Sequence, residues 1–548
     1  MKLPSFRGTK APVAELSESG LVVPPVPPEG TTDHPSYNEL VEKGTLTYPI
    51  KEPYQSAILR YAKNEVTYAV VEPVLTEKER GILERVEGSY EILVNMDTVL
   101  VDSEDRLRFV ENAFDDLADI FGLKLSDDER KRILYYVERD FLGFGKIDAL
   151  VNDKFIEDIS CNGPAQPIYI YHRFFESIRT SIAFEELELN GFILRLAQLS
   201  GRHISILQPI RDAALPDGSR INMTLGKEVT KKGSTFTIRK FKSEPMSPIE
   251  LLLSGTGDAK IFGFLWLVVE YGNSILISGG TASGKTTTLN AISMLIRTEN
   301  KIVSIEDTPE INLAHPNWVQ AVTRIGFGEQ ASISGISGIS GVSRPGGGKS
   351  AGDISLYDLL IAALRQRPDY IIVGEVRGEE AYTLFQAISV GHAALGTIHA
   401  ASMVELLARV ESAPMNVPRV LMANIDLVIF MGAVKKEGTM EKVRRMRDIV
   451  EVLGVDPERK EVVTNELFKW DPAEDGFDFT GRSFLIEKLA NKLGLRKEEL
   501  YAEVANRTKV LEWMKRKGIT HYEKVTEIVG RYYTNPKEVL EECDRQDT

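Results

Sequence analysis

The chain has 548 residues, of which 43% are apolar and 27% are charged. This composition is typical of a soluble globular protein with roughly three to four structural units, and it excludes a disordered or fibrous chain. The net charge of −14 disfavours nucleic acid as the main partner. The two cysteines, Cys161 and Cys543, are too few for a disulfide scaffold or a cysteine-based metal site, so a reducing compartment is expected.

The N-terminus and the hydropathy pattern predict a cytoplasmic protein. The first residues lack the apolar core of a signal peptide. The strongest apolar run, at 262–269, is far shorter than the roughly 18 residues of a membrane span. We therefore expect any association with a membrane to be peripheral and to come through a partner or the protein surface.

Composition and periodicity divide the chain into successive segments. Prolines and scattered charges mark a flexible arm, and later apolar runs that alternate with helical periodicities are typical of an α/β domain with a largely parallel sheet. The predicted segments are the arm at 1–35, an N-terminal helical domain at 36–145, an α+β (PAS-like) lobe at 146–242, a linker at 243–248, the α/β domain at 249–432 and a helical appendage at 433–548.

One helix of the N-terminal region has a clear start and a clear apolar face. Ser126 and Glu129 have the spacing of a capping box, in which each side chain accepts a hydrogen bond from the other's backbone. Ile133, Val137 and Phe141 follow at intervals of four residues. We expect these three side chains to lie in a core.

The strongest functional signal is a phosphate loop between a predicted strand at 274–277 and a predicted helix. Its glycines let backbone amides converge on phosphate oxygens, and the helix N-terminus favours negative charge. The lysine should reach the β and γ phosphates, and the following threonine should bind Mg²⁺. The predicted ATP-binding residues are Gly279, Thr281, Ala282, Ser283, Gly284, Lys285, Thr286 and Thr287.

Two further strands end in carboxylates. Residues 302–310 form an apolar strand followed by Glu306, Asp307 and Glu310, and residues 369–378 form a second one with Glu375 at its tip. Acidic groups beside a phosphate loop can hold Mg²⁺ through water or orient the attacking water. The alternative is an exposed acidic turn in the first case and a plain buried strand in the second.

Two histidines, His392 and His399, form a further candidate cluster. Their spacing of seven residues does not match a helical zinc pair, and no cysteine lies nearby in the sequence, so metal binding is not expected. A polar contact to the γ-phosphate or to a neighbouring subunit is the functional interpretation. Structural histidines with satisfied hydrogen bonds are the alternative.

These four motifs, in this order, resemble the secretion and pilus motor ATPases of the type II and type IV secretion superfamily. The acidic segment at 305–310, the segment at 373–378 and the segment from Gly391 to His399 look like that family's Asp box, Walker B and His box. The resemblance implies an α/β fold class: a RecA-like phosphate-loop ATPase domain, preceded by an α+β N-terminal domain and a helical N-terminal region, with a helical C-terminal appendage.

The resemblance also implies a homo-hexameric ring in which arginines of the N-terminal lobe reach the nucleotide. The candidates are Arg220 and Arg239, with Arg211 a weaker third. A trans arginine offsets charge on the transferring phosphoryl oxygens. Taken singly, each arginine could equally be a surface charge or part of a salt bridge.

Within this frame, the predicted catalytic residues are Glu310, Glu375, Arg220, Arg239 and His399. The resemblance favours Glu310 as the residue that orients or deprotonates water, while the sequence alone does not separate it from Glu375. Thr286 and Glu375 are the predicted Mg²⁺ ligands, partly through water. ATP and Mg²⁺ are the expected cofactors.

Short stretches at 363–369, 417–419, 470–473 and 480–483 look specifically archaeal. They indicate the branch that contains the archaellum motor and the archaeal pilus assembly ATPases, and we favour the archaellum motor. Its partners would be a polytopic membrane platform protein and cytoplasmic motor-accessory proteins, with no nucleic acid. An adhesive pilus or a type II-like secretion system is the nearest alternative.

Two hypotheses from other classes remain at the level of sequence. One is a nucleotide-dependent scaffold or switch with negligible hydrolysis, and the other is a RecA-like nucleic-acid motor, which the acidity disfavours. The basic runs at 435–436 and 444–447 are interpreted as solvated surface or, alternatively, as a contact to anionic lipid. A Gly/Ser-rich insertion at 329–352 departs from the family pattern and is interpreted as a passive loop or as a flap near the nucleotide.

Overall fold

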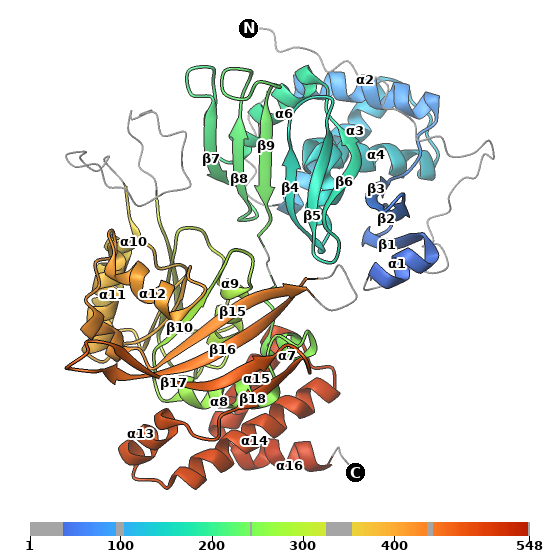
Figure 1. Ribbon diagram of the computed structural model, residues 1–548. Coiled ribbons are helices and arrows are strands. Elements are labelled where there is room, and N and C mark those ends of the chain that lie inside the picture. The colour runs from blue at the N-terminus through green and yellow to red at the C-terminus, as the bar shows by residue number, and fades with distance from the viewer. Residues whose placement is uncertain are drawn as a thin grey trace. The chain divides into compact units, whose positions relative to one another are not determined.

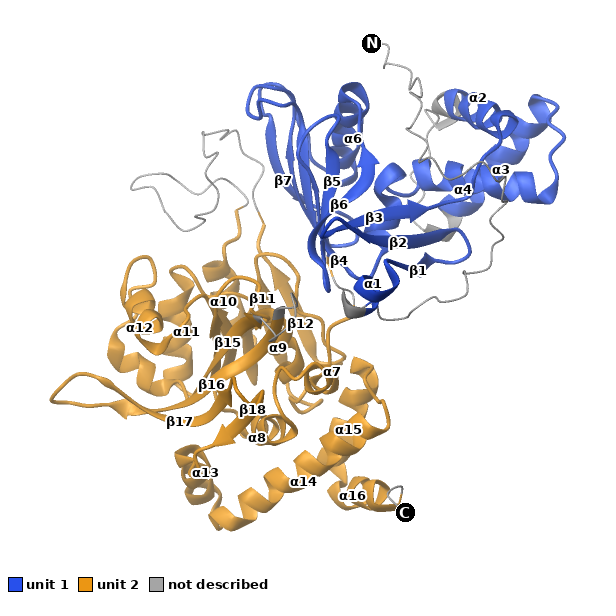
Figure 2. Ribbon diagram, turned by 45° about the vertical axis from the view of Figure 1, so that its right-hand side comes forward, with its two compact units in different colours: residues 1–240 blue, residues 241–548 orange. Residues whose placement is uncertain are grey.

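The computed structural model describes residues 35, 37–94, 103–241, 244–324, 353–435 and 442–545. The chain forms two compact units, unit 1 at 1–240 and unit 2 at 241–548, which Figure 2 distinguishes by colour. The predicted arm at 1–35, except Pro35, and the Gly/Ser-rich insertion at 329–352 lie outside the described residues.

Unit 1 is built on a nine-stranded sheet with the order β1-β2-β3-β6-β5-β4-β9-β8-β7 (Figure 1). Neighbouring strands are antiparallel, except for the parallel pair β3 and β6. The strands are β1 (Thr45–Lys51), β2 (Gln55–Ala62), β3 (Glu65–Val71), β4 (Ile156–Cys161), β5 (Pro167–His172), β6 (Glu176–Ala183), β7 (Ile210–Ala214), β8 (Arg220–Thr224) and β9 (Thr235–Arg239).

The described helices of unit 1 fall into two groups. The first packs its apolar faces together and consists of α2 (Glu77–Val94), α3 (Ser103–Ile120) and α4 (Asp127–Phe141). The second accompanies the sheet and consists of α1 (Tyr37–Lys43), η1 (Gly145–Ile147), α5 (Asp148–Asn152) and α6 (Glu186–Leu199).

The predicted start and apolar face of α4 are confirmed. The Glu129 backbone N–H donates to Ser126 Oγ, and the Ser126 N–H donates to the Glu129 carboxylate at 2.8 Å. Ile133 and Val137 are fully buried in the helical cluster, and Phe141 packs against it.

The segment at 36–145 is not helical throughout, because β1 to β3 join the sheet of the following lobe. These strands are held by a buried polar group that lies far along the chain. The hydroxyls of Tyr48 and Tyr68 both donate to Asp153 at 2.7 Å, and Tyr48 Oη lies 3.2 Å from His172 Nε2. Burial lowers the pKa of His172 to about 4. The sequence pattern did not reveal these strands, because the residues that hold them lie far away in the chain.

Unit 2 contains a second nine-stranded sheet with the order β12-β11-β13-β14-β10-β15-β16-β17-β18. The strands from β12 to β15 are parallel, and β16 to β18 extend the sheet in antiparallel fashion. The strands are β10 (Ile275–Gly279), β11 (Ile302–Glu306), β12 (Trp318–Val322), β13 (Tyr370–Val373), β14 (Ala393–Ile398), β15 (Leu427–Lys435), β16 (Lys442–Val455), β17 (Val462–Asp471) and β18 (Gly476–Phe479).

Helices cover both faces of this sheet, and strand alternation assigns each face to its own core. Ile275 and Ile277 of β10 belong to one apolar cluster, and Leu276 belongs to the other. The first cluster includes α7 (Pro248–Leu253), α8 (Ala259–Glu270), α9 (Lys285–Ser293), α13 (Phe484–Leu493), α14 (Lys497–Arg516), α15 (Tyr522–Thr534) and α16 (Pro536–Arg545). The second includes α10 (Leu356–Leu364), α11 (Glu380–Ser389), α12 (Met403–Glu411) and η2 (Arg419–Asn424).

The strand order of unit 2 confirms the predicted RecA-like domain. The parallel strands in chain order are β10, β11, β13, β14 and β15. In the sheet, β10 lies between β14 and β15, the last two of them. Such an order requires crossover helices on both faces, which the two clusters supply. Within the described ranges, no helix combines the length and apolar character needed to cross a bilayer.

The segment at 433–548 contains three strands before its helices begin. The charged run around Arg445 looked like solvated surface, yet it lies within the 14-residue strand β16. Arg445 is only 4% exposed, and its guanidinium donates to both carboxylate oxygens of Asp475, at 2.7 and 2.8 Å. A buried arginine is tolerated because this bidentate pair satisfies it.

The C-terminal helices are integral to unit 2. A Cβ on Gly263 of α8 would lie 2.6 Å from Thr508 Oγ1 of α14, so the two helices approach as closely as only glycine allows. On α15, the Tyr533 hydroxyl donates to the backbone oxygen of Leu295 at 2.7 Å, next to the end of α9.

A buried ion pair joins α8 to α14. Glu270 is 8% exposed and Arg507 is 3% exposed at their side chains, and the Arg507 guanidinium donates to Glu270 and, at 3.1 Å, to Glu503. The guanidinium carbon also lies 5.3 Å from the centre of the Trp266 ring. A charge buried this deeply depends on its partner.

We expect Arg507→Leu to destabilise unit 2 by about 3 kcal/mol, because the buried Glu270 would lose one of its two arginine partners and keep only the partly exposed Arg297. Lys509→Ala on the same helix removes an exposed ion pair with Asp544 and should cost at most about 1 kcal/mol. Thermal and denaturant unfolding of the two variants checks this, and equal stabilities would contradict it.

Candidate functional site

The predicted phosphate loop follows the central strand of the unit 2 sheet. Strand β10 is buried along its whole length and pairs in parallel with β14 and β15. Its last residue, Gly279, has no room for a side chain, because a Cβ would lie 2.7 Å from the Met431 backbone oxygen and 2.7 Å from Ser283 Oγ. The loop is therefore held at the C-terminal edge of the parallel strands.

The loop has the backbone conformation of an anion-binding turn. Ala282 and Gly284 have φ angles of +57° and +91°, in the left-handed region, and Gly284 caps helix α9, which begins at Lys285. Alternating right- and left-handed residues turn successive N–H groups toward one point, and the helix N-terminus adds partial positive charge. Thr286 and Thr287, in the first turn of α9, are partly exposed.

Side chains of the loop are ordered around one carbonyl. The Lys285 ammonium and the Ser283 hydroxyl both donate to the Gly280 backbone oxygen at 2.8 Å. The ammonium is thus folded back over the loop. Thr281, which is exposed, lies with Oγ1 2.9 Å from His399 Nε2.

Glu306, at the end of β11, organises the neighbouring acidic loop. It is 1% exposed, and its Oε1 accepts the backbone N–H groups of Glu310 and Ile311 at 2.8 Å each. Its Oε2 accepts from Gln320 Nε2 at 3.1 Å. Burial raises the pKa of the Glu306 carboxyl to about 7, against the effect of these hydrogen bonds.

The loop that carries Glu310 is tied to the helix of the phosphate loop. Asn290 Nδ2 donates to the Glu310 backbone oxygen at 2.9 Å, and the Asn312 N–H donates to Asn290 Oδ1 at 3.0 Å. Thr286 lies four residues before Asn290, so both lie on one face of α9. The structure therefore places Glu310 and Thr286 on the same side of this helix.

Glu375 follows strand β13 at the same edge of the sheet. Its side chain is 43% exposed and lies 3.9 Å from the Arg377 guanidinium, which forms a closer ion pair with Asp307. The Gly374 N–H donates to the Ile305 oxygen at 3.0 Å, which aligns the ends of β13 and β11. Glu375 is thus an exposed carboxylate beside the acidic segment that follows β11.

The two predicted histidines do not form a cluster. They lie before and after β14, so the extended strand separates them by roughly 20 Å. Only His399 contacts the phosphate loop. Burial and the positive charges of Lys285 and Arg409 lower the pKa of His399, which favours a neutral ring.

The predicted arginines belong to unit 1. Arg220 begins β8 and Arg239 ends β9, and the two residues are direct partners in the antiparallel register. The two residues therefore lie side by side, where β8 begins and β9 ends. Arg211, on β7, donates to the His203 backbone oxygen at 2.8 Å.

Two polar residues at this site were missed as site residues in the sequence. Glu306 was noted only as part of an acidic run, although a carboxylate at the end of an entirely buried strand is the signal of a structural role. Asn290 gave no signal, because its hydrogen bonds reach residues 20 and 22 positions away.

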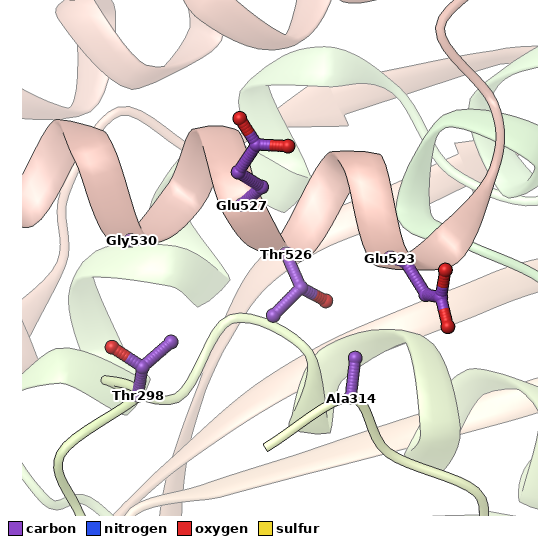
Figure 3. Close-up of a pocket in the computed structure, with 6 residues that line it drawn as sticks. All are labelled: Thr298, Ala314, Glu523, Thr526, Glu527 and Gly530. Carbon is purple, nitrogen blue, oxygen red and sulfur yellow. The ribbon is translucent and has the colours of Figure 1, made fainter. Parts of the chain in front are cut away.

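A pocket of about 440 Å³ lies at the other end of α9, away from the phosphate loop. Figure 3 shows Glu523, Thr526, Glu527 and Gly530 along α15 on one side of the pocket and Thr298 and Ala314 on the other. None of the predicted site residues lines it. The predicted site lies instead at the C-terminal edge of the parallel strands.

A family model described as type II/IV secretion system protein matches residues 143–541. This chain belongs to that family. The predicted resemblance to this family is therefore confirmed. The matched residues include the phosphate loop, both acidic segments and His399.

Individual relatives extend the likeness over more of the chain. The protein is 35% identical over 525 residues to an uncharacterized protein of Methanocaldococcus jannaschii, with 90% of each chain covered. It is 28% identical over 291 residues to the type IV secretion system protein VirB11 of Bartonella quintana, which covers 47% of this chain and 75% of the relative.

Solved structures of secretion and pilus ATPases also match. The VirB11 ATPase of the Brucella suis type IV secretion system, in complex with sulphate, covers 55% of this chain and 90% of its own at 21% identity, with a TM-score of 0.27. The pilus retraction motor PilT with bound ADP covers 65% and 88% at 18% identity, with a TM-score of 0.37.

The buried carboxyl of Glu306 predicts a pH dependence of stability. Its pKa in the folded protein is about 7, against 4.5 for an ordinary glutamate, so the folded state keeps this proton as pH rises between these values while the unfolded state releases it. Stability should therefore fall through this window relative to Glu306→Gln, by about 3 kcal/mol in all.

Thermal unfolding of the wild-type protein and of Glu306→Gln at pH 5 and pH 8 checks this expectation. Glu379→Gln, which changes an exposed carboxylate of the same unit, should follow the wild type at both pH values. A stability difference between wild type and Glu306→Gln that does not change with pH would contradict the prediction.

Proposed function

We propose that this secretion-family protein binds ATP with Mg²⁺ and hydrolyses the ATP to ADP and phosphate. One observation carries the proposal. The loop after the central strand has residues in the left-handed region, and it lies beside two strand ends that bear carboxylates, in a RecA-like strand order. Membership of the type II/IV secretion system family supports it.

In this proposal, the residues at 279–287 hold the phosphates. The N–H groups of the loop and of the first turn of α9 bind the phosphate oxygens, and the Lys285 ammonium exchanges the Gly280 oxygen for the β and γ phosphates. His399, whose ring contacts Thr281, would make a polar contact to the terminal phosphate or to a neighbouring subunit.

The residues present fit a magnesium ion. Thr286 offers a partly exposed hydroxyl at the start of α9, and Glu375 offers an exposed carboxylate, either directly or through water. Oxygen ligands supplemented by water and phosphate are the usual environment of Mg²⁺. When bound, Mg²⁺ neutralises the charge that develops on the phosphate oxygens.

We assign the attacking water to Glu310. Its backbone is fixed from both sides, by Glu306 and by Asn290 of the phosphate-loop helix, which reduces the freedom of the segment that bears the carboxylate. Glu310 would orient the water and accept its proton, while Glu375 supports the metal.

We further propose that the protein acts as a homo-hexamer whose Arg220 and Arg239 reach the nucleotide of a neighbouring subunit. Their pairing in register supports the proposal, because it brings both arginines to the same end of strands β8 and β9, where they would reach one neighbouring site together. The ring would work in the cytoplasm, peripherally on the membrane through a polytopic platform protein and with motor-accessory proteins.

The driven process would be assembly or rotation of an archaeal type IV pilus-like filament, with the archaellum as the favoured case. The relative in Methanocaldococcus jannaschii, which matches along 90% of both chains, supports the archaeal branch. An adhesive pilus or a type II-like secretion system is the alternative within the class. A nucleotide-dependent scaffold without hydrolysis is the alternative from another class, and a phosphate-release assay separates it from a motor.

Glu310→Gln should lower ATP turnover by about a hundredfold or more, since a positioned general base contributes about 10² to 10⁴. Its affinity for ATP should stay near that of the wild type. Phosphate release and binding of a fluorescent ATP analogue measure the two properties, and Glu379→Gln serves as the exposed-carboxylate control. Normal turnover in Glu310→Gln would refute the assignment.

Mixed rings test the trans arginine. Arg239→Ala and Lys285→Ala should each be nearly inactive, but a 1:1 mixture should regain activity, because about one quarter of its interfaces combine an intact loop with an intact arginine. Arg220→Ala should behave like Arg239→Ala, whereas Arg211→Ala should stay active alone. A mixture no more active than its components would rule out arginine donation between subunits.

A further inference from the structure

An arginine of unit 2, Arg444, lies against the phosphate loop of its own chain. It belongs to β16 and pairs in register with Ala433 of β15. Strand β15 is in turn the parallel neighbour of β10, with Met431 paired to Gly279 at the start of the loop. Ala433 lies two residues beyond Met431. Its partner Arg444 is therefore level with the loop that follows Gly279.

Arg444 contacts the loop in two ways. Its Nε donates to the Ala282 backbone oxygen at 3.2 Å. Its aliphatic stem lies along Gly284, because a Cβ on that glycine would come within 3.0 Å of Arg444 Cδ and within 3.8 Å of its Cβ and Cγ.

Both contacts fall on the left-handed residues of the loop. Ala282 is an alanine at a φ of +57°, which side-chain-bearing residues rarely adopt, and Gly284 has a φ of +91°. A loop that turns its N–H groups inward must turn carbonyl oxygens outward. Arg444 stabilises this arrangement from outside the loop, because it donates to one of these oxygens and covers Gly284.

The neighbouring arginines of the same strand have different tasks. Arg445 is buried and held by Asp475 and by the backbone oxygen of Ser254. Arg447 lies 3.2 Å from Asp448. Of these three arginines, Arg444 is the one hydrogen-bonded to the phosphate loop, so its positive charge stands beside the place where phosphate oxygens would bind.

We infer that Arg444 is a same-subunit cation of the nucleotide site, which braces residues 282–284 and raises the affinity for the polyphosphate of a nucleoside di- or triphosphate. The inference rests on the proposed ATP binding. In a chain with a net charge of −14, a second local cation beside Lys285 offsets repulsion of an anionic ligand. Arginine suits this position because its planar group donates in several directions.

The test measures binding of fluorescently labelled ATP, ADP and AMP to the full chain. Arg444→Met keeps the stem over Gly284 but loses the charge, and should bind ATP and ADP about tenfold more weakly, with a smaller effect on AMP. Arg444→Lys should fall between Arg444→Met and wild type. Arg459→Ala, which removes an exposed arginine of the β16–β17 connection, should bind like the wild type.

Salt dependence adds a readout that packing alone would not move. Wild-type affinity for ATP should fall more steeply with ionic strength than that of Arg444→Met. If Arg444→Met binds ATP like the wild type, with the same salt dependence, the arginine only packs against the loop and the inference is overturned. If Arg444→Met does not fold, the same comparison is made between Arg444→Lys and Arg444→Gln.

The result also separates this inference from the proposed function. If the wild type binds ATP, Lys285→Ala loses binding and Arg444→Met keeps it, ATP binding stands and the role of Arg444 falls. If the wild type binds none of the three nucleotides, both fall together.

Discussion

The burial of β10 on both faces and along both edges is the constraint on which the rest of unit 2 depends. Helices from two separate clusters cover its faces, and β14 and β15 occupy its edges, so the strand cannot shift without breaking both cores. Its last residue is then fixed in position, and the loop after it inherits that rigidity. The other strand ends that carry Glu306, Glu375 and His399 are aligned to the same edge by their parallel registers.

Rigidity at this edge comes from polar groups placed with little freedom. Glu306 uses one oxygen for two backbone amides of the acidic loop and the other for Gln320. Asn290 fastens the same loop to α9, and Arg444 fastens the phosphate loop from β16. Preorganised groups of this kind lose little conformational freedom when a ligand binds, which is the general advantage of building a site on fixed elements.

Sequence patterns were sufficient wherever the information is local. The phosphate loop, the α4 capping box and the run of parallel strands each depend on residues within about ten positions, and all were predicted. Features that depend on distant partners were missed: the strands β1 to β3, which need Asp153, and the strand character of the charged segment around Arg445, which needs Asp475. Asn290 and Arg444 were missed for the same reason, since their partners are remote in the chain. The hexamer and its trans arginines stay predictions.

The link between Tyr533 and Leu295 changes how far the nucleotide-binding fold extends. Helix α9 has the phosphate loop at its start, and α15 packs where it ends, with Gly530 against Thr298. Val525, Val529 and Cys543 share one apolar cluster with Leu289 and Ile292 of α9. A polypeptide shortened before Tyr522 would leave that cluster open to water, so the minimal unit that can fold around the loop includes the C-terminal helices.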